Sequence, residues 1–217
     1  MTSAAVWTLS RSRPEKRGGA IVRREVDAAA ADRLDGLDGL DDAALVELSL
    51  ADRAGAFDLI VERHRQRVYQ LCYRFVGNHE DASDLAQDVF VRAFRGLRGF
   101  RGHSTIGTWL YRIGVNVCLN RVSAKTLVTE DLDARQHVDA RTESPADRVL
   151  KHERAIRVRA AIAQLPRKQR ATLVLRIYHE LSHQEIAEVL GSSVGAVKAN
   201  FFHALGNLKK QLGGQGL

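Results

Sequence analysis

The chain has 217 residues, of which 45% are hydrophobic, enough to bury a core and to exclude wholesale disorder. Only 6% of the residues are aromatic and three are proline, a balance that favours helices. The net charge of +7 favours a polyanionic partner without identifying one, and the lack of any long apolar run or signal-type block predicts a cytoplasmic protein without a membrane span.

The first half of the chain predicts a mobile tail followed by one helical domain. Residues 1–40 show no sustained period, whereas apolar residues from Asp42 to Phe75 recur at spacings of three and four, and Gly77 supplies a stop. Further helices are expected over 80–97, with Phe94 in its apolar stripe, and over 106–124, with a glycine-containing loop over 98–105 between them. We therefore place the first domain at 41–125.

The second half predicts a linker and another helical domain. Residues 126–147 turn acidic and polar and contain Pro145, which is typical of an interdomain linker. Helices are expected over 146–164 and 167–178, and two shorter ones follow, so the second domain spans 148–212 and a tail spans 213–217. The predicted fold is all-α, with two small helical domains joined by a flexible linker.

Two capped helices near the C-terminus predict a helix-turn-helix. Ser182 and Glu185 have the spacing of a capping box, Gly191 ends that helix, and Ser193 can cap the next one. We expect the second helix to turn its apolar residues inward: Val194, Val197, Phe201, Leu205 and Leu208. Its outer face, which would enter the major groove, would present Ser192, Ala196, Lys198, Ala199, Asn200 and His203. A generic helical hairpin is the alternative.

One string in this region matches the zinc-protease motif HExxH. The motif requires both histidines on one continuous helix and a third ligand downstream. Because Ser182 is expected to begin a new helix, His179 and His183 would lie on either side of a break. Cys72 and Cys118 lie in apolar runs without metal-ligand spacing and are expected to be buried thiols. We expect no catalytic residues, no metal and no other cofactor.

Charge is segregated along the first domain. No acidic residue occurs from Val89 to Thr129, and the segment 100–120 interleaves arginines with aromatic residues, as single-strand binders do. Asn116 and Asn120 lie one helical turn apart and could bond base edges. Just upstream, Asp84, Gln87 and Asp88 share one helix face, which is a poor surface for DNA and indicates a basic protein partner.

Two segments resemble a known family. DASDLAQDVFVRAFRGLRGFRGHSTIGTWLYRIGVNVCLNR is similar to region 2 of the extracytoplasmic-function sigma factors of RNA polymerase. LPRKQRATLVLRIYHELSHQEIAEVLGSSVGAVKANFFHALGNLKK is similar to their region 4. The resemblance covers about residues 55–125 and 148–212, and it implies a factor that binds core polymerase, recognises the −35 and −10 promoter elements and promotes DNA melting.

The resemblance also implies roles for individual residues. The β′ clamp helices of polymerase would contact Asp84, Gln87, Asp88, Val91 and Arg92. The −10 element, with a flipped base, would contact Phe100, Arg101, Gly102, His103, Ser104, Thr105, Thr108, Trp109, Arg112, Asn116 and Asn120. The −35 element would contact Ser192, Ser193, Gly195, Ala196, Lys198, Ala199, Asn200 and His203, while the second domain docks on the β flap.

The resemblance further implies an anti-sigma partner. One departure concerns the second helix of the helix-turn-helix, where Asn200, His203 and Gly206 stand at positions that hold arginine in the family, which lowers the expected phosphate contact. The alternative function is a stand-alone helix-turn-helix regulator that binds operator DNA without polymerase. That alternative leaves the acidic face and the 100–105 loop without a role.

Overall fold

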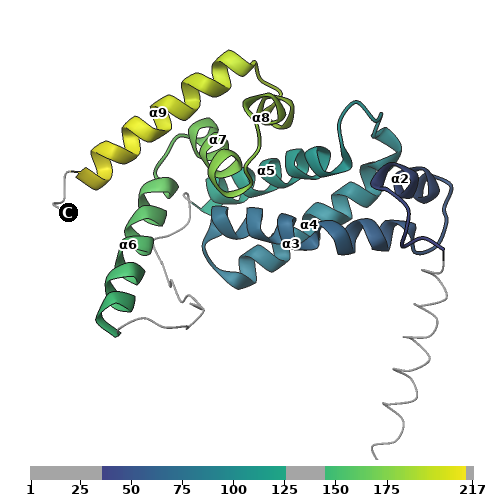
Figure 1. The fold of residues 1–217 in the computed structure, drawn as a ribbon, viewed down its shortest axis with the longest axis horizontal. Coiled ribbons are helices and arrows are strands. Elements are labelled where there is room, and N and C mark those ends of the chain that lie inside the picture. The colour runs from purple at the N-terminus through teal and green to yellow at the C-terminus, as the bar shows by residue number, and fades with distance from the viewer. Residues whose placement is uncertain (1–35, 126–144, 214–217) are drawn as a thin grey trace, which may run out of the picture.

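The computed structural model describes residues 36–125 and 145–213. The first helical unit contains α2 (Asp42–Leu50), α3 (Ala56–Val76), α4 (His79–Gly96) and α5 (Ile106–Lys125), with the short 3-10 helix η1 (Leu97–Gly99) after α4 (Figure 1). Short polar side chains fix where these helices begin. The Asp41 carboxylate accepts a hydrogen bond from the Ala44 N–H at 2.8 Å, and the Asn78 side chain accepts one from the Asp81 N–H at 2.8 Å.

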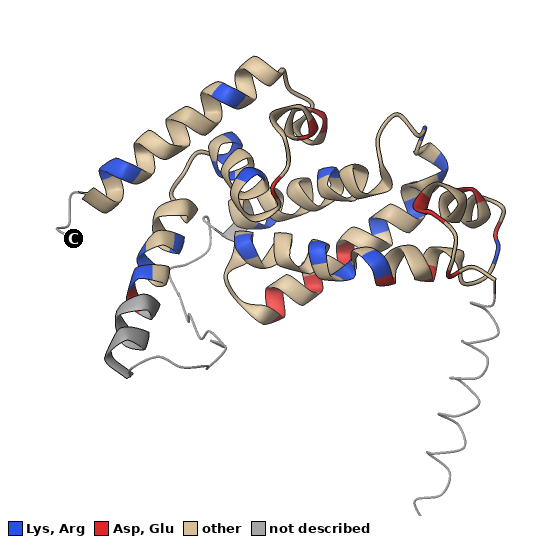
Figure 2. Cartoon of the chain, in the orientation of Figure 1, with Lys and Arg blue, Asp and Glu red and all other residues tan. Residues whose placement is uncertain are grey.

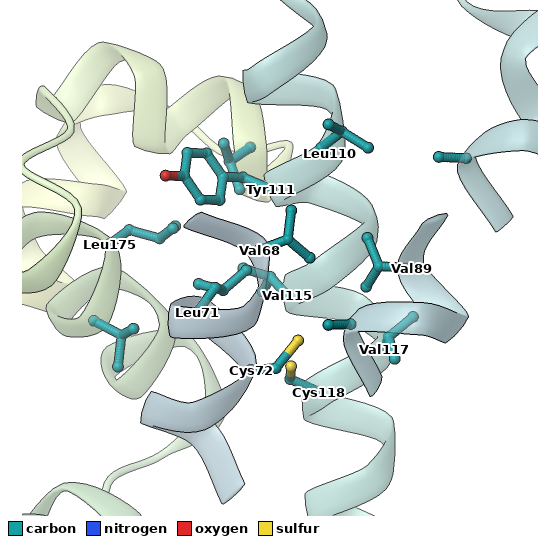
Figure 3. Packing of buried hydrophobic residues seen from close by; sticks show 14 of the residues in the cluster. Val68, Leu71, Cys72, Val89, Leu110, Tyr111, Val115, Val117, Cys118 and Leu175 are labelled. Carbon is teal, nitrogen blue, oxygen red and sulfur yellow. The ribbon is translucent and has the colours of Figure 1, made fainter. Parts of the chain in front are cut away.

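Helices α3, α4 and α5 pack around one apolar core. Val68 and Leu71 of α3, Val89 of α4 and Val115 of α5 are almost fully buried there (Figure 3). A Cβ atom at Gly114 would lie 2.7 Å from a Leu71 methyl carbon, so the glycine allows α5 to approach α3 closely.

The second unit contains α6 (Pro145–Ala163), α7 (Arg167–Tyr178), α8 (His183–Leu190) and α9 (Val194–Gly213). The expected capping box is confirmed, because Ser182 Oγ accepts from the Glu185 N–H at 3.2 Å and the Glu185 carboxylate accepts from the Ser182 N–H at 2.7 Å. Gly191 then ends α8 in the left-handed conformation. Helices α8 and α9 therefore form a helix-turn-helix, and the all-α fold is confirmed over the described residues.

The two units pack against each other, with α7 and α8 next to α3 and α5 (Figure 1). Leu175 of α7 is fully buried and lies near Leu71 and Tyr111 (Figure 3). Arg170 of α7 is 5% exposed, and its guanidinium donates to the Phe75 carbonyl in the last turn of α3. That carbonyl has no partner within its own helix, so one unit caps a helix of the other. The expected linker, 126–147, lies mostly outside the described residues.

The structure differs from the sequence-based expectations at several positions. The helical structure within the apolar pattern from Asp42 to Phe75 is interrupted between α2 and α3, where Asp52 and Gly55 have positive φ angles of 58° and 84°. Leu37, in the segment expected to be a tail, is buried. Leu205, expected to point inward, is 46% exposed, and Ala204 is buried in its place.

Candidate nucleic-acid and protein interfaces

The loop between η1 and α5 presents polar side chains around one aromatic pair. The rings of Phe100 and Trp109 lie 5.3 Å apart between centroids, and both residues are half-buried. Trp109 also packs over Gly96, at whose position a Cβ would meet the indole at 3.6 Å. The Thr105 hydroxyl begins α5 by accepting from the Thr108 N–H at 3.1 Å. In the loop and at the start of α5, Arg101, Gly102, His103 and Thr105 are exposed, while Ser104 and Thr108 are half-buried.

Helix α5 carries the remaining polar candidates at one-turn spacing. Arg112, Asn116 and Asn120 are all exposed and lie four residues apart, so they follow one face of the helix. Asn120 lies 11 residues after Trp109, about 16 Å along the helix axis, so the structure does not bring it to the loop. Its amide oxygen instead accepts a hydrogen bond from Arg167 of the second unit at 3.2 Å. Figure 2 shows only basic and uncharged residues on α5.

Helix α4 carries the acidic face. Asp84 and Gln87 are exposed, as the spacing predicts, whereas Asp88 is half-buried. Asp88 forms an i, i+4 ion pair with Arg92 at 3.0 Å, and such exposed pairs contribute little to stability. Asp84 has no ion pair among the described residues. The neighbouring Arg121 of α5 pairs with Asp81 at 2.8 Å, and its pKa is raised by Asp81 first and then by the charge of Asp84. Asp84 is therefore available to a basic partner.

The acidic face continues into an apolar groove of about 790 Å³. Gln87 belongs to both surfaces, and the groove is also lined by Val91, Phe57, Phe90 and Phe94. Phe94, expected within the buried stripe of its helix, is 63% exposed and contacts Phe57 edge-on at 5.1 Å between ring centroids. An exposed apolar groove beside a charged face is typical of a protein-binding surface.

The helix-turn-helix presents the expected outer face on α9. Ser193 caps α9 by accepting from the Ala196 N–H at 3.2 Å. The first turns of α9 leave Gly195, Ala196, Lys198, Ala199 and His203 exposed, while Ser192 and Asn200 are half-buried. Small side chains at the start of a recognition helix allow its backbone to approach base edges closely.

Sequence reasoning missed the most exposed apolar residue of α9. Phe202 is 74% exposed and was assigned neither to the inner nor to the outer face. Its position four residues after Lys198 was the available signal, because residues four apart share a helix face. Phe202 and the outward-facing Leu205 therefore lie on the lysine-bearing side of α9.

The HELSH string does not form a zinc-protease helix. His179 follows the last residue of α7, Glu180 has a left-handed φ of 57°, and His183 begins α8. His179 lies in the contact between the units, where burial first, and then the charges of Arg74 and Arg67, lower its pKa to about 4. Across residues 36–125 and 145–213 no group of three or more metal-ligating side chains comes together.

Comparison with known proteins matches both units to one family. The model of sigma-70 region 2 matches residues 60–127, and that of sigma-70 region 4 matches residues 155–208. The RNA polymerase sigma-H factor of Pseudomonas aeruginosa is 35% identical over 180 residues, covering 79% of this chain and 93% of its own. The ECF RNA polymerase sigma factor SigW of Bacillus subtilis is 36% identical over 166 residues, covering 72% of this chain and 89% of its own.

A solved structure agrees with the fold. CnrH, determined in complex with the cytosolic domain of CnrY, aligns with a TM-score of 0.60 and 27% identity over 80% of this chain and 98% of CnrH. Among the helices described, none combines the length and the apolar character needed to cross a lipid bilayer.

Proposed function

Because the chain belongs to the sigma-70 family of RNA polymerase sigma factors, in its extracytoplasmic-function group, we propose that it directs core polymerase to promoters by reading two DNA elements and melting one of them. The relatives are sigma factors, which are not enzymes, and no reacting group is assigned to this chain. In this proposal the first helical unit binds polymerase and the −10 element, and the second unit binds the −35 element.

The polymerase surface is the exposed face of α4. Asp84 and Gln87 offer a charge and an amide, and Asp88 with Arg92 offers a paired charge that a partner can rearrange. The β′ clamp helices are the proposed occupant of this face, with Val91 at the edge of the adjoining groove. Charged residues around an apolar centre give an interface both its specificity and its rate of association. The second unit would dock on the β flap.

The −10 surface combines the 100–105 loop with the exposed face of α5. Extruding a base from a duplex costs a few kcal/mol, which stacking and base-edge hydrogen bonds can offset. The Phe100–Trp109 pair offers ring faces beside a loop rich in hydrogen-bonding groups, and Asn116 offers an amide on the same helix as Trp109. The absence of acidic residues on α5 favours the approach of DNA phosphates.

The −35 surface is the start of α9. Lys198 would contact phosphate and Asn200 a base edge, since asparagine can form paired bonds with adenine. Two sites on one chain act as a tethered pair, so that binding at one element raises the effective concentration at the other. Weak recognition by each unit then gives specific recognition of the promoter.

The observation that carries this proposal is the separation of surfaces within the unit matched to region 2. An exposed acidic face lies on α4, whereas the 100–105 loop and α5 contain no acidic residue. The second unit, which packs against the first, holds a helix-turn-helix. The decisive experiment is transcription in vitro from linear promoter DNA with purified core polymerase, with and without the chain. Promoter-specific transcripts are expected only when both are present. A stand-alone regulator would instead bind the same DNA without polymerase and start no transcript.

An anti-sigma protein is a further proposed partner. CnrH, the 27% identical structure, was solved with the cytosolic domain of a second protein bound to it. Co-purification of this chain with a protein that blocks its transcription in vitro would identify such a partner.

A further inference from the structure

The imidazole ring of His64 joins three helices of the first unit. His64 lies on α3, and its Nε2 is 2.7 Å from Oδ2 of Asp42 at the start of α2. Another edge of the ring faces the first turn of α5, where a Cβ atom at Gly107 would lie 3.4 Å from Cε1 and 3.7 Å from Nδ1. The His64 side chain is only 12% exposed, so the ring packs between α2 and the backbone of α5.

The Asp42 carboxylate that holds this ring is itself fixed to α3. Arg63 donates one hydrogen bond to Asp42 Oδ1 at 3.1 Å and another to the Asp38 carbonyl at 3.1 Å. Burial raises the pKa of Asp42, but the hydrogen bonds with His64 and Arg63 outweigh burial and lower it below the ordinary value of 3.8. Asp42 is therefore a carboxylate with a partner on each oxygen, and it fixes the position of the His64 ring.

Helix α2 also supports the segment on the other side of the 100–105 loop. It contacts both η1, which precedes the loop, and α5, which follows it, and it lies at the loop end of the unit (Figure 1). Leu97 of η1 and Ile106 of α5 are both buried. The two ends of the loop thus depend on the same part of the fold.

The loop has few contacts that could fix its shape from within. At its start the Phe100 N–H donates to the Leu97 carbonyl at 2.9 Å, and at its end the Thr105 hydroxyl accepts from the Thr108 N–H at 3.1 Å. Between these two bonds, no hydrogen bond or ion pair among the described residues is made by the side chains of Arg101, His103 and Ser104. A displacement of the first turn of α5 would therefore displace the loop.

We propose that His64, fixed by Asp42, is a positioning residue that holds the first turn of α5 and thereby keeps the 100–105 loop in the shape that receives the extruded −10 base. This inference rests on the proposed function and adds to it two residues that touch no DNA. A loop that already has its binding shape loses less conformational freedom when the base enters. Without the His64–Asp42 bond a smaller fraction of molecules has that shape, and the apparent affinity for the base falls with the fraction.

The test removes the bond from each side in turn. His64→Phe keeps a ring over Gly107 but cannot bond to Asp42, and Asp42→Ala removes the other partner. In the full chain bound to purified core polymerase, each change should lower open-complex occupancy about tenfold, equivalent to one hydrogen bond to a charged group. The double variant should lose little more, because both changes remove the same bond. Permanganate reactivity of −10 thymines measures occupancy on a promoter that the wild type opens.

A second readout reports the loop without DNA or polymerase. Trp109 lies two residues after Gly107 and is half-buried against Phe100. In a Trp7→Phe background Trp109 is the one remaining tryptophan, so the fluorescence comes from it alone. His64→Phe and Asp42→Ala should each shift its emission to the red and increase its quenching by acrylamide. Affinity for core polymerase should stay at the wild-type value, since neither residue lies on the exposed face of α4.

Two control variants remove comparable contacts elsewhere. Arg63→Met removes the other partner of Asp42 but leaves the His64 bond, and it should change occupancy less than about twofold, as expected of a partly exposed ion pair. His79→Ala removes a histidine that hydrogen-bonds to Tyr69 at the start of α4. That position is about 26 Å along the helix axis from Gly96, which packs against Trp109. His79→Ala should keep both occupancy and emission.

Three results would overturn the inference. Wild-type occupancy in His64→Phe or Asp42→Ala would remove the bond from DNA melting. Unchanged Trp109 emission in both variants would show that any loss does not act through the loop. An equal loss in Arg63→Met would assign the effect to the anchoring of α2 in general. If the wild-type complex opens no promoter, the proposed function fails instead, and the emission of Trp109 still decides whether His64 holds the loop.

Discussion

The Tyr111 hydroxyl of α5 lies 3.0 Å from Nδ1 of His179 at the end of α7, and the two rings meet edge-on with centroids 5.0 Å apart. This pair joins the two helical units through a residue of each. The imidazole Nε2 is buried without a partner among the described residues, and the positive charges of Arg74 and Arg67 lie nearby. The contact therefore favours an uncharged His179 at neutral pH.

Stability should fall as the pH is lowered from about 6.5 toward 4. The unfolded chain binds a proton at His179 near the ordinary pKa of 6.5, whereas burial and the two arginines hold the folded pKa at about 4. Protons therefore favour the unfolded state between these values, and above pH 6.5 the effect is absent. Urea unfolding across this range should show a smaller loss in His179→Phe, which keeps a ring but cannot titrate. An exposed-histidine control, His203→Phe, should behave as wild type, and equal slopes in all three proteins would contradict the expectation.

Replacing Arg170 by Met should destabilise the protein by about 1–3 kcal/mol, although it keeps an apolar side chain of similar length. The change leaves the Phe75 carbonyl without its donor and removes the guanidinium 5.3 Å from the Phe75 ring. The free energy of unfolding from chemical denaturation measures the effect. Arg157→Met, an exposed arginine of α6, serves as control and should change stability by less than about 0.5 kcal/mol. Similar values for the two variants would show that the buried contact does not hold the units together.

Reversing the charge of the acidic face of α4 should weaken polymerase binding strongly without unfolding the chain. Asp84→Lys with Asp88→Lys replaces two carboxylates by cations on the proposed contact with the β′ clamp helices, and we expect an affinity loss of about tenfold or more. The control pair Glu153→Lys and Glu188→Lys makes the same change in charge at exposed positions of the second unit. Affinity for purified core polymerase would be measured for both. A loss shared equally by the control would point to net charge rather than to α4.

If the 100–105 loop and α5 bind a flipped −10 base, variants at this surface should form less open complex. Phe100→Ala or Asn116→Ala should lower open-complex occupancy about tenfold, since stacking or base-edge bonding contributes roughly 1–3 kcal/mol per residue. Permanganate reactivity of −10 thymines measures melting, and a promoter already opened at the −10 element should restore part of the activity. Lys198→Ala with Asn200→Ala provides the comparison, because it should weaken −35 binding and leave permanganate reactivity on the opened template near wild type. Duplex melting by Asn116→Ala at wild-type levels would make Asn116 an ordinary surface residue.

Local signals in the sequence were enough to predict most helix boundaries. Gly77 and Gly191 were expected to end helices and Ser182 with Glu185 to begin one, and the structure confirms all three. The break between α2 and α3 was missed because apolar spacing continues across it. Gly55 and Asp52 were the available signals in the sequence, because glycine, and occasionally aspartate, accepts the positive φ angles that both residues have in the structure.

The residues that face outward were harder to predict than the helices themselves. After Phe201 the helical period allows either Ala204 or Leu205 to point inward, and the larger side chain was the natural choice. The structure buries the smaller one and leaves Leu205 46% exposed. Contacts between distant segments, such as Arg170 with Phe75, leave no local pattern in the sequence and required the three-dimensional arrangement.

The hydrogen bond from Arg167 to Asn120 has a consequence for the apparent affinity of the protein for promoter DNA. The amide oxygen of Asn120 already accepts a hydrogen bond from Arg167 in the packed arrangement, so this proposed −10 contact competes with the contact between the units. If DNA binds only molecules in which the units have separated, the measured dissociation constant equals the intrinsic one divided by the separated fraction. Each 1.4 kcal/mol that favours packing then costs a factor of ten in affinity. A partner that holds the units apart would therefore raise the affinity for promoter DNA by the same factor without contacting the DNA.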